Sequence, residues 1–208
     1  MMAHLNNPYF SEMRKTGEIK TFGLPQLHAI LRRVKHKNMP EARSLVILLY
    51  YLGLKTSEML SLLSSDFEIS SQYIKVNIKQ KTTLMFKNEG DLREVAEYIK
   101  NKPPYFVLFH DFISNYKKTV KLKSGEVKTY ITKSKKVHDC IKKWSKAAGY
   151  DLIPIWFMHN RLRKLGKVTT VQEFLYWTGR KSIRSVERYM HDDNKNTEEL
   201  KKLSVKVK

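Results

Sequence analysis

The chain has 208 residues, and its 41% hydrophobic content is enough for the buried core of one large domain or two small ones. Its 40 lysines and arginines outnumber its 20 aspartates and glutamates, so the net charge is +20 and the chain attracts polyanions. DNA, RNA and anionic membrane surfaces are therefore the candidate partners. No apolar run approaches the ~20 residues that a membrane-spanning helix requires, which argues against a membrane protein.

The N-terminus and the single cysteine indicate the compartment. Residues 1–15 lack the long apolar core of a secretory signal, and Cys140 has no second cysteine for an internal disulfide. Both features predict a cytoplasmic, reducing environment, that of a host cell if the source is viral. Apolar residues recur at helical spacing around Cys140, which favours a packed core thiol over a reactive one.

Helical spacing of apolar residues dominates the first part of the chain. Residues 1–22 carry few such positions and are predicted to form an N-terminal arm. One helix is expected over 24–34 and a largely buried one over 42–54, with Gly53 as its C-cap. The next helix is expected to begin at residue 56 or 57, where Thr and Ser are good N-caps.

Two hairpins are expected in the middle of the chain. Apolar and polar residues alternate over 73–79 and resume at 84–86, which predicts two strands joined by a turn at 80–83 with lysines at the tip. Lysines also recur through 117–136, where a Ser-Gly pair predicts a second hairpin or a basic loop. These charges form either a solvated surface or an arm laid along phosphates.

Most of the remaining chain is predicted to be helical. Helices are expected over residues 92–99, 137–148, 154–166, 171–178 and 183–190. A C-terminal tail, residues 194–208, is expected to add a helix with a narrow apolar stripe of Leu200 and Leu203. The pattern predicts an α+β fold, mostly helical with a small antiparallel β-hairpin or sheet, in one domain over residues 23–193.

Common catalytic signatures are missing from the sequence. It contains no metal-ligand spacing, no Gly-rich phosphate loop and no Ser/His/Asp order, which argues against hydrolases and nucleotide-cofactor enzymes. The histidines are scattered, so no bound metal is expected.

Two segments carry a specific pattern. The first is Gly53-Leu54-Lys55-Thr56-Ser57-Glu58-Met59-Leu60, and the second runs from Gly179 to Glu187-Arg188-Tyr189-Met190-His191. In order and spacing, residues 24–192 resemble the catalytic domain of the tyrosine recombinases, the phage-integrase family. The string Gly179-Arg180-Lys181 is similar to integrases of crenarchaeal spindle-shaped viruses, which points to an archaeal virus or plasmid as the source.

The resemblance implies a DNA strand-transfer site. In that family a tyrosine becomes joined to the 3′-phosphate, cations bind the non-bridging oxygens, and a hairpin lysine protonates the departing 5′-oxygen. Carried over to this chain, Tyr189 is the nucleophile, Arg180 binds a phosphate oxygen and Lys55 stands where the family has its first arginine. The general acid is Lys81, or Lys79 if the hairpin register shifts. Such a reaction requires no metal and no nucleotide cofactor.

The catalytic set departs from the family pattern at two places. Lys55 keeps the positive charge but lacks the planar fork with which an arginine grips two phosphate oxygens. Counted from Pro154, the family's H-x-L-R segment falls on residues 155–158, so its histidine and second arginine are missing there. Arg161, Arg163 and His159 are the candidate substitutes, and Arg161 is displaced by only ~4.5 Å along a helix. Each lost oxyanion donor typically lowers the rate ~10² to 10³-fold.

Three functions remain open at this point. The first is a DNA-binding protein of the tyrosine recombinase family whose altered site is weakly active or inactive. The alternative is an active site-specific strand transferase that cuts and rejoins DNA through a 3′-phosphotyrosine at Tyr189. An RNA-binding or architectural protein is the third, although no RNA-reading motif is present.

Double-stranded DNA is the expected partner in the first two cases. The residues expected to contact it are Lys79, Lys181, Arg184 and Arg188. The tail at 194–208 is expected either to dock on a neighbouring protomer, forming a homo-oligomer on DNA, or to pack on its own domain.

Overall fold

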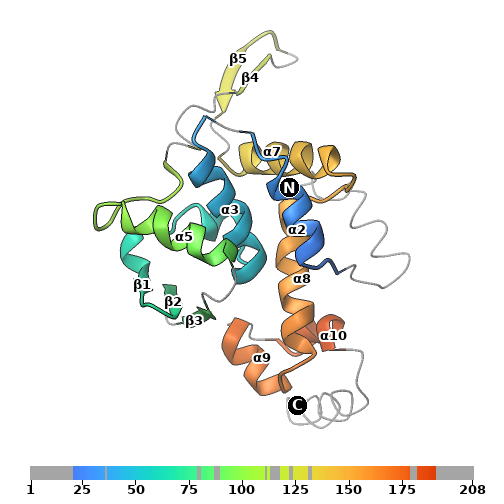
Figure 1. Ribbon diagram of the computed structural model, residues 1–208. Helices are drawn as coiled ribbons and strands as arrows, with labels where there is room; N and C mark the ends of the chain where they lie inside the picture. Colours follow the sequence, from blue (N-terminus) through green and yellow to red (C-terminus); the bar gives the residue numbers. More distant parts are fainter. Residues whose placement is uncertain are drawn as a thin grey trace. The chain divides into compact units, whose positions relative to one another are not determined.

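A computed structural model describes residues 21–35, 37–78, 81–86, 90–110, 112, 118–121, 124–130, 133–178 and 182–190 (Figure 1). The helices are α2 (Leu24–Leu31), α3 (Met39–Leu52), α4 (Thr56–Met59), η1 (Ser64–Asp66), α5 (Gly90–Lys100), α7 (Lys133–Ala147), α8 (Pro154–Gly166), α9 (Val171–Thr178) and α10 (Arg184–Met190). The strands are β1 (Phe67–Ile69), β2 (Tyr73–Ile78), β3 (Lys81–Phe86), β4 (Lys118–Lys121) and β5 (Val127–Tyr130). The predicted α+β, mostly helical fold class is confirmed.

The chain divides into two compact units, and each is described by itself. The N-terminal unit is Phe22–Met158, and the C-terminal unit combines Met1–Thr21 with His159–Lys208. The boundaries expected from the sequence, an arm at 1–22, a domain at 23–193 and a tail at 194–208, remain predictions. Residues 1–20 and 191–208 lie outside the described residues.

Helix α3 forms the centre of the N-terminal unit because its residues from Ser44 to Tyr50 are all buried, mostly apolar side chains on every side of the helix. Asn38 caps its start by accepting a hydrogen bond from the Glu41 N–H, and Gly53 ends it in the left-handed conformation, φ 62°, as predicted. Helices α2 and α5 pack against it. The Arg43 guanidinium ties all three together, because it binds both Glu94 carboxylate oxygens and the Leu31 carbonyl. The hydrogen bond to Glu94 raises the pKa of Arg43 above its ordinary value.

A three-stranded antiparallel sheet, in the order β1-β2-β3, belongs to the same unit. Ile74 and Val76 of β2 point into the core and alternate with polar residues, as a half-buried strand requires. The turn predicted at 80–83 is wrong, because β2 and β3 pair as far as Ile78 opposite Lys81. Two residues therefore suffice for the connection, and the β-branched Thr82 and Thr83 lie in β3 instead.

The second predicted hairpin is confirmed as the antiparallel pair β4–β5 (yellow in Figure 1).

The aromatic side chains at the two ends of the N-terminal unit pack on each other. Phe22 contacts the rings of Phe157 at 4.9 Å and Tyr50 at 5.5 Å, measured between ring centroids. Phe22, placed in the arm by sequence, is therefore a buried core residue.

Candidate active site

Tyr189, the residue expected to be the nucleophile, lies on α10 and is almost fully buried, with 1% of its surface exposed. Its hydroxyl oxygen forms a hydrogen bond of 2.6 Å with Nδ1 of His159, which lies on α8. The Tyr189 ring stacks on the His159 ring at 5.6 Å and on the Phe174 ring of α9 at 5.8 Å. We call Tyr189, His159 and Phe174 the Tyr189 cluster. Side chains from the three helices α8, α9 and α10 thus meet at the tyrosine.

The hydrogen bond has the geometry of a nucleophile beside its base. When the neutral imidazole carries its proton on Nε2, the Tyr189 hydroxyl donates to Nδ1 of His159. A distance of 2.6 Å is within the range for direct proton transfer between a hydroxyl and a general base. His159, one of the three candidate substitutes named from the sequence, contacts Tyr189 through its ring and through Nδ1.

Helix α9 presents Phe174 to the cluster and is fixed at its N-terminus by a capping box. The Thr170 N–H and hydroxyl both donate to the Glu173 carboxylate, and the Glu173 N–H donates to the Thr170 hydroxyl oxygen. These hydrogen bonds lower the pKa of Glu173 below its ordinary value. The cap begins α9 at a defined residue, which places Phe174 on the face that packs on Tyr189.

The other site residues predicted for the C-terminal unit lie near the cluster residues along the chain. Arg161 and Arg163 follow His159 on α8, and both side chains are half-buried. Arg184 is exposed at the start of α10. The backbone of Arg188 belongs to α10, while Arg180, Lys181 and the side chain of Arg188 lie outside the described residues. Of residues 155–158, where the sequence analysis expected the H-x-L-R segment, Trp156 and Phe157 are buried, and Ile155 and Met158 are half-buried.

The site residues predicted from the Gly53–Leu60 segment and from the β2–β3 hairpin lie in the N-terminal unit. Lys55 is exposed at the N-cap of α4, where its N–H donates to the Glu58 carboxylate at 3.1 Å. Lys81 is the first residue of β3, opposite Ile78. Lys79 and the side chain of Lys81 lie outside the described residues.

A basic surface that the sequence analysis did not single out lies on α7. Four exposed lysines share one side of this helix, and we call them the lysine face of α7: Lys135, Lys142, Lys143 and Lys146. The opposite side buries Val137, Ile141 and Trp144 in the core. The spacing of seven and four residues between Lys135, Lys142 and Lys146 is the signal that would have identified this face.

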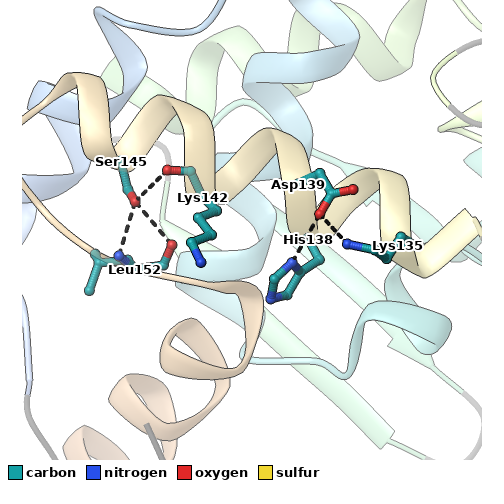
Figure 2. Close-up of polar contacts among 6 residues, drawn as sticks. All are labelled: Lys135, His138, Asp139, Lys142, Ser145 and Leu152. Atoms are coloured by element: carbon teal, nitrogen blue, oxygen red, sulfur yellow. Dashed lines mark hydrogen bonds and ion pairs between the residues drawn. The ribbon is translucent and has the colours of Figure 1, made fainter. Parts of the chain in front are cut away.

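The lysine face contains one carboxylate. Figure 2 shows Lys135 and His138 converging on Asp139, with distances of 2.5 Å from Lys135 Nζ and 3.4 Å from His138 Nδ1. No ion pair is found for Lys142, Lys143 or Lys146 within the described part of the chain. Their charges therefore face solvent.

The end of α7 is held by Ser145, whose hydroxyl bridges to the next segment (Figure 2). It donates to the carbonyl of Leu152 and accepts from the Leu152 N–H, both at 3.0 Å. Ser145 is buried, so these bonds satisfy polar groups that would otherwise be costly. They fix the orientation of α7 against the chain that leads into α8.

Three further properties of the described residues concern a metal ion, the thiol and a membrane. Within the described ranges, no three His, Cys, Asp or Glu side chains form a group able to hold a metal ion. Cys140 is half-buried on α7, and burial raises the pKa of its thiol above the ordinary value. No helix among the described residues is both long and apolar enough to cross a membrane.

Comparison with known proteins identifies the fold. No family model matches the chain, and no curated protein sequence matches it. Among solved structures, XerH site-specific recombinase in a post-cleavage complex with its palindromic difH substrate is similar, with a TM-score of 0.57 and 15% identity over 91% of this chain. XerA recombinase is similar with a TM-score of 0.55 and 14% identity over 89% of this chain. The Tn1549 transposon integrase, in complex with circular intermediate DNA, is similar with a TM-score of 0.51 and 18% identity over 89% of this chain.

The chain therefore has the fold of the tyrosine recombinases, as the two sequence motifs predicted. It spans 54% of the XerH chain, 63% of the XerA chain and 67% of the Tn1549 integrase chain. At 14–18% identity the likeness establishes the fold, and the chemistry has to be argued from the residues of this chain.

Proposed function

We propose that the protein binds double-stranded DNA and cuts and rejoins it through Tyr189, as a tyrosine-type site-specific recombinase or integrase. The observation that carries this proposal is the hydrogen bond between the Tyr189 hydroxyl and His159. A tyrosine becomes a nucleophile when a positioned base takes its proton, and His159 is a base at the required distance.

The proposed step balances without a cofactor. The Tyr189 oxygen attacks the scissile phosphorus and its proton passes to Nδ1 of His159. A bond forms between that oxygen and phosphorus while the bond from phosphorus to the 5′-oxygen breaks. The leaving oxygen takes a proton from the ammonium of Lys81, and the reverse sequence rejoins a strand.

The cations that stabilise the transition state are proposed from position along the chain. Arg163 and Arg161 follow His159 on α8, and Arg180 lies between α9 and α10. Lys55 supplies a charge at the start of α4. Guanidinium and ammonium groups directed at the non-bridging oxygens lower the barrier because negative charge develops there.

Double-stranded DNA is proposed as the substrate for three reasons. The net charge of +20 favours a polyanion, and the lysine face of α7 presents exposed cations along one helix. In addition, the similar structures of XerH and the Tn1549 integrase are complexes with DNA. Lys79, Lys181, Arg184 and Arg188 are proposed as further phosphate contacts.

A second candidate function is DNA binding without strand transfer. It is favoured by the burial of Tyr189, since a phenol oxygen within a closed cluster cannot meet a phosphate unless the cluster opens. It is also favoured by Lys55, which lacks the bidentate geometry of an arginine. Strand transfer therefore requires that DNA binding expose the Tyr189 hydroxyl.

A covalent trapping experiment tests the proposal and separates the two functions. The full chain is incubated with a pool of duplexes that carry a nick and random sequence around it, so that a cleaved strand end diffuses away and rejoining is blocked. We expect a detergent-stable protein–DNA adduct that Tyr189→Phe abolishes. Tyr176→Phe is the matched control, because Tyr176 is exposed on the neighbouring helix α9. Binding of the pool without any adduct would select the non-catalytic function.

The source, compartment and assembly complete the proposal. We assign the protein to the interior of a cell, where its DNA substrate lies, and to an archaeal virus or plasmid. Residues 194–208 are proposed to dock on a neighbouring protomer on DNA. A chain that ends at Asn194 should then lose self-association in analytical ultracentrifugation with DNA, whereas unchanged association would show that the tail has no such role.

A further inference from the structure

The last turn of α8 touches the backbone of the proposed nucleophile. Gly166 ends α8 and is buried. A Cβ atom at Gly166 would lie 2.4 Å from the carbonyl oxygen of Tyr189 and 3.0 Å from its carbonyl carbon. Real Cβ atoms essentially never approach other atoms so closely, so the two backbones meet where only a glycine fits.

Glycine is required here by space and not by conformation. Gly166 does not have a positive φ, in contrast to Gly53, Gly125 and Gly149. Alanine would favour the helical conformation by about 1 kcal/mol, so helix propensity does not account for the glycine. The close approach of α10 does account for it.

Helix α8 therefore contacts Tyr189 at two points. His159 binds the hydroxyl at the end of the side chain, and Gly166 lies against the carbonyl of the backbone. The two residues are seven positions apart, two helical turns or about 10.5 Å, and so lie on the same side of α8. Phe174 of α9 stacks on the Tyr189 ring between these contacts. Two points on one rigid helix set both the depth and the rotation of the tyrosine.

We propose that Gly166 is a positioning residue for Tyr189, which sets where its hydroxyl lies relative to His159 and to a bound phosphate. This inference rests on the proposed strand transfer. Ordinary contact begins at 3.4 Å, so relieving the 2.4 Å approach of a methyl group at Gly166 to the Tyr189 carbonyl requires the two backbones to separate by about 1.0 Å. Because in-line attack depends on the position of the nucleophile, a displacement of about 1 Å costs on the order of 10² in rate.

The test compares Gly166→Ala with Gly90→Ala. Gly90 is also a terminal residue of a helix, the first residue of α5. An added Cβ there meets nothing within 4 Å, so Gly90→Ala is the matched control. On the nicked duplex pool, we expect Gly166→Ala to lower the rate of adduct formation about 10²-fold with the dissociation constant for DNA changed less than twofold. Gly90→Ala should change neither. An adduct rate equal to that of the unmodified chain in Gly166→Ala would overturn the proposal.

A second readout does not depend on activity. In the full chain labelled with ¹⁵N-histidine, the His159 Nδ1 resonance is assigned by its change in Tyr189→Phe. We expect Gly166→Ala to shift this resonance and Gly90→Ala to leave it in place. If the unmodified chain forms no adduct, strand transfer fails as a function, while the resonance still decides the role of Gly166. An unshifted resonance, or loss of the helical circular dichroism spectrum in Gly166→Ala, would refute a positioning role.

Discussion

The Tyr189 cluster is small and buried, whereas the lysine face of α7 is extended and exposed. The cluster joins three side chains from three helices through one hydrogen bond of 2.6 Å and two ring contacts. The lysine face consists of four separate charges on one helix. The strand transfer proposed at the cluster depends on positions within an ångström, while the DNA binding proposed for the lysine face depends on the number of charges. Substitutions in the two regions should affect different quantities.

The largest effect is expected for a substitution of His159, in the Tyr189 cluster. Gln in its place keeps a polar group beside Tyr189 but is not a base at neutral pH. We expect His159→Gln to lower the rate of adduct formation about 10² to 10⁴-fold, because general-base catalysis contributes this much. The dissociation constant for DNA should stay within twofold of that of the unmodified chain. The measurement is the first-order rate on the nicked pool together with binding by fluorescence anisotropy.

The matched control is His28→Gln. His28 lies in the N-terminal unit and hydrogen-bonds Asp91 at 2.8 Å, an interaction that glutamine can retain. The rate of adduct formation by the His28→Gln variant should equal that of the unmodified chain. A similar loss of rate in both variants would show that His159 has no special role.

The next effect concerns the lysine face of α7. We expect Lys142→Glu combined with Lys146→Glu to weaken DNA binding on the order of tenfold, because two phosphate contacts are lost. The dependence of log K on log salt should become shallower by about 2, roughly one unit for each lysine. Binding titrations between 50 and 200 mM salt, on the order of physiological ionic strength, measure both quantities.

The control for this prediction keeps the same change in net charge. Lys35→Glu combined with Lys100→Glu reverses two exposed lysines that lie outside α7. If DNA contacts the lysine face, the control should retain most of the affinity. Equal losses in the two double variants would mean that total charge, and not α7, decides binding.

The smallest effect concerns Cys140. Burial raises the pKa of this thiol, so its thiolate, the reactive form, is scarcer at a given pH than that of an ordinary cysteine. We expect its alkylation by iodoacetamide to be slower than that of glutathione at neutral pH and to reach its midpoint at higher pH. Cys140→Ser should leave the rate of adduct formation and the dissociation constant for DNA within twofold of those of the unmodified chain. A midpoint at or below that of glutathione would contradict the effect of burial.

Much of the fold could be predicted because its signals are local. Gly53 ends α3 and Pro154 begins α8 where the sequence indicated, since caps and prolines act through the backbone of their own turn. Helix α9 was predicted with its observed bounds. The turn of the first hairpin was misplaced because cross-strand pairing, which sequence alternation does not reveal, extends β3 back to Lys81.

The candidate site was only partly accessible to sequence. The spacing from Gly179 to Tyr189 predicts Tyr189 as the nucleophile, because the motif lies within one short segment. His159 was named as a substitute phosphate ligand, whereas it contacts the tyrosine itself. The helix over 137–148 was predicted from the spacing of its apolar residues, whereas the lysine face depends on the spacing of the lysines on its opposite side.

By itself, then, the sequence determined the charge and most of the helices and predicted Tyr189 as the nucleophile, all from composition or from residues a few positions apart. The tertiary structure alone decided what surrounds that tyrosine. His159 is thirty positions from Tyr189, and Gly166 meets its carbonyl from a different helix. No local pattern encodes such contacts, because they arise when separate helices pack and bury their side chains together.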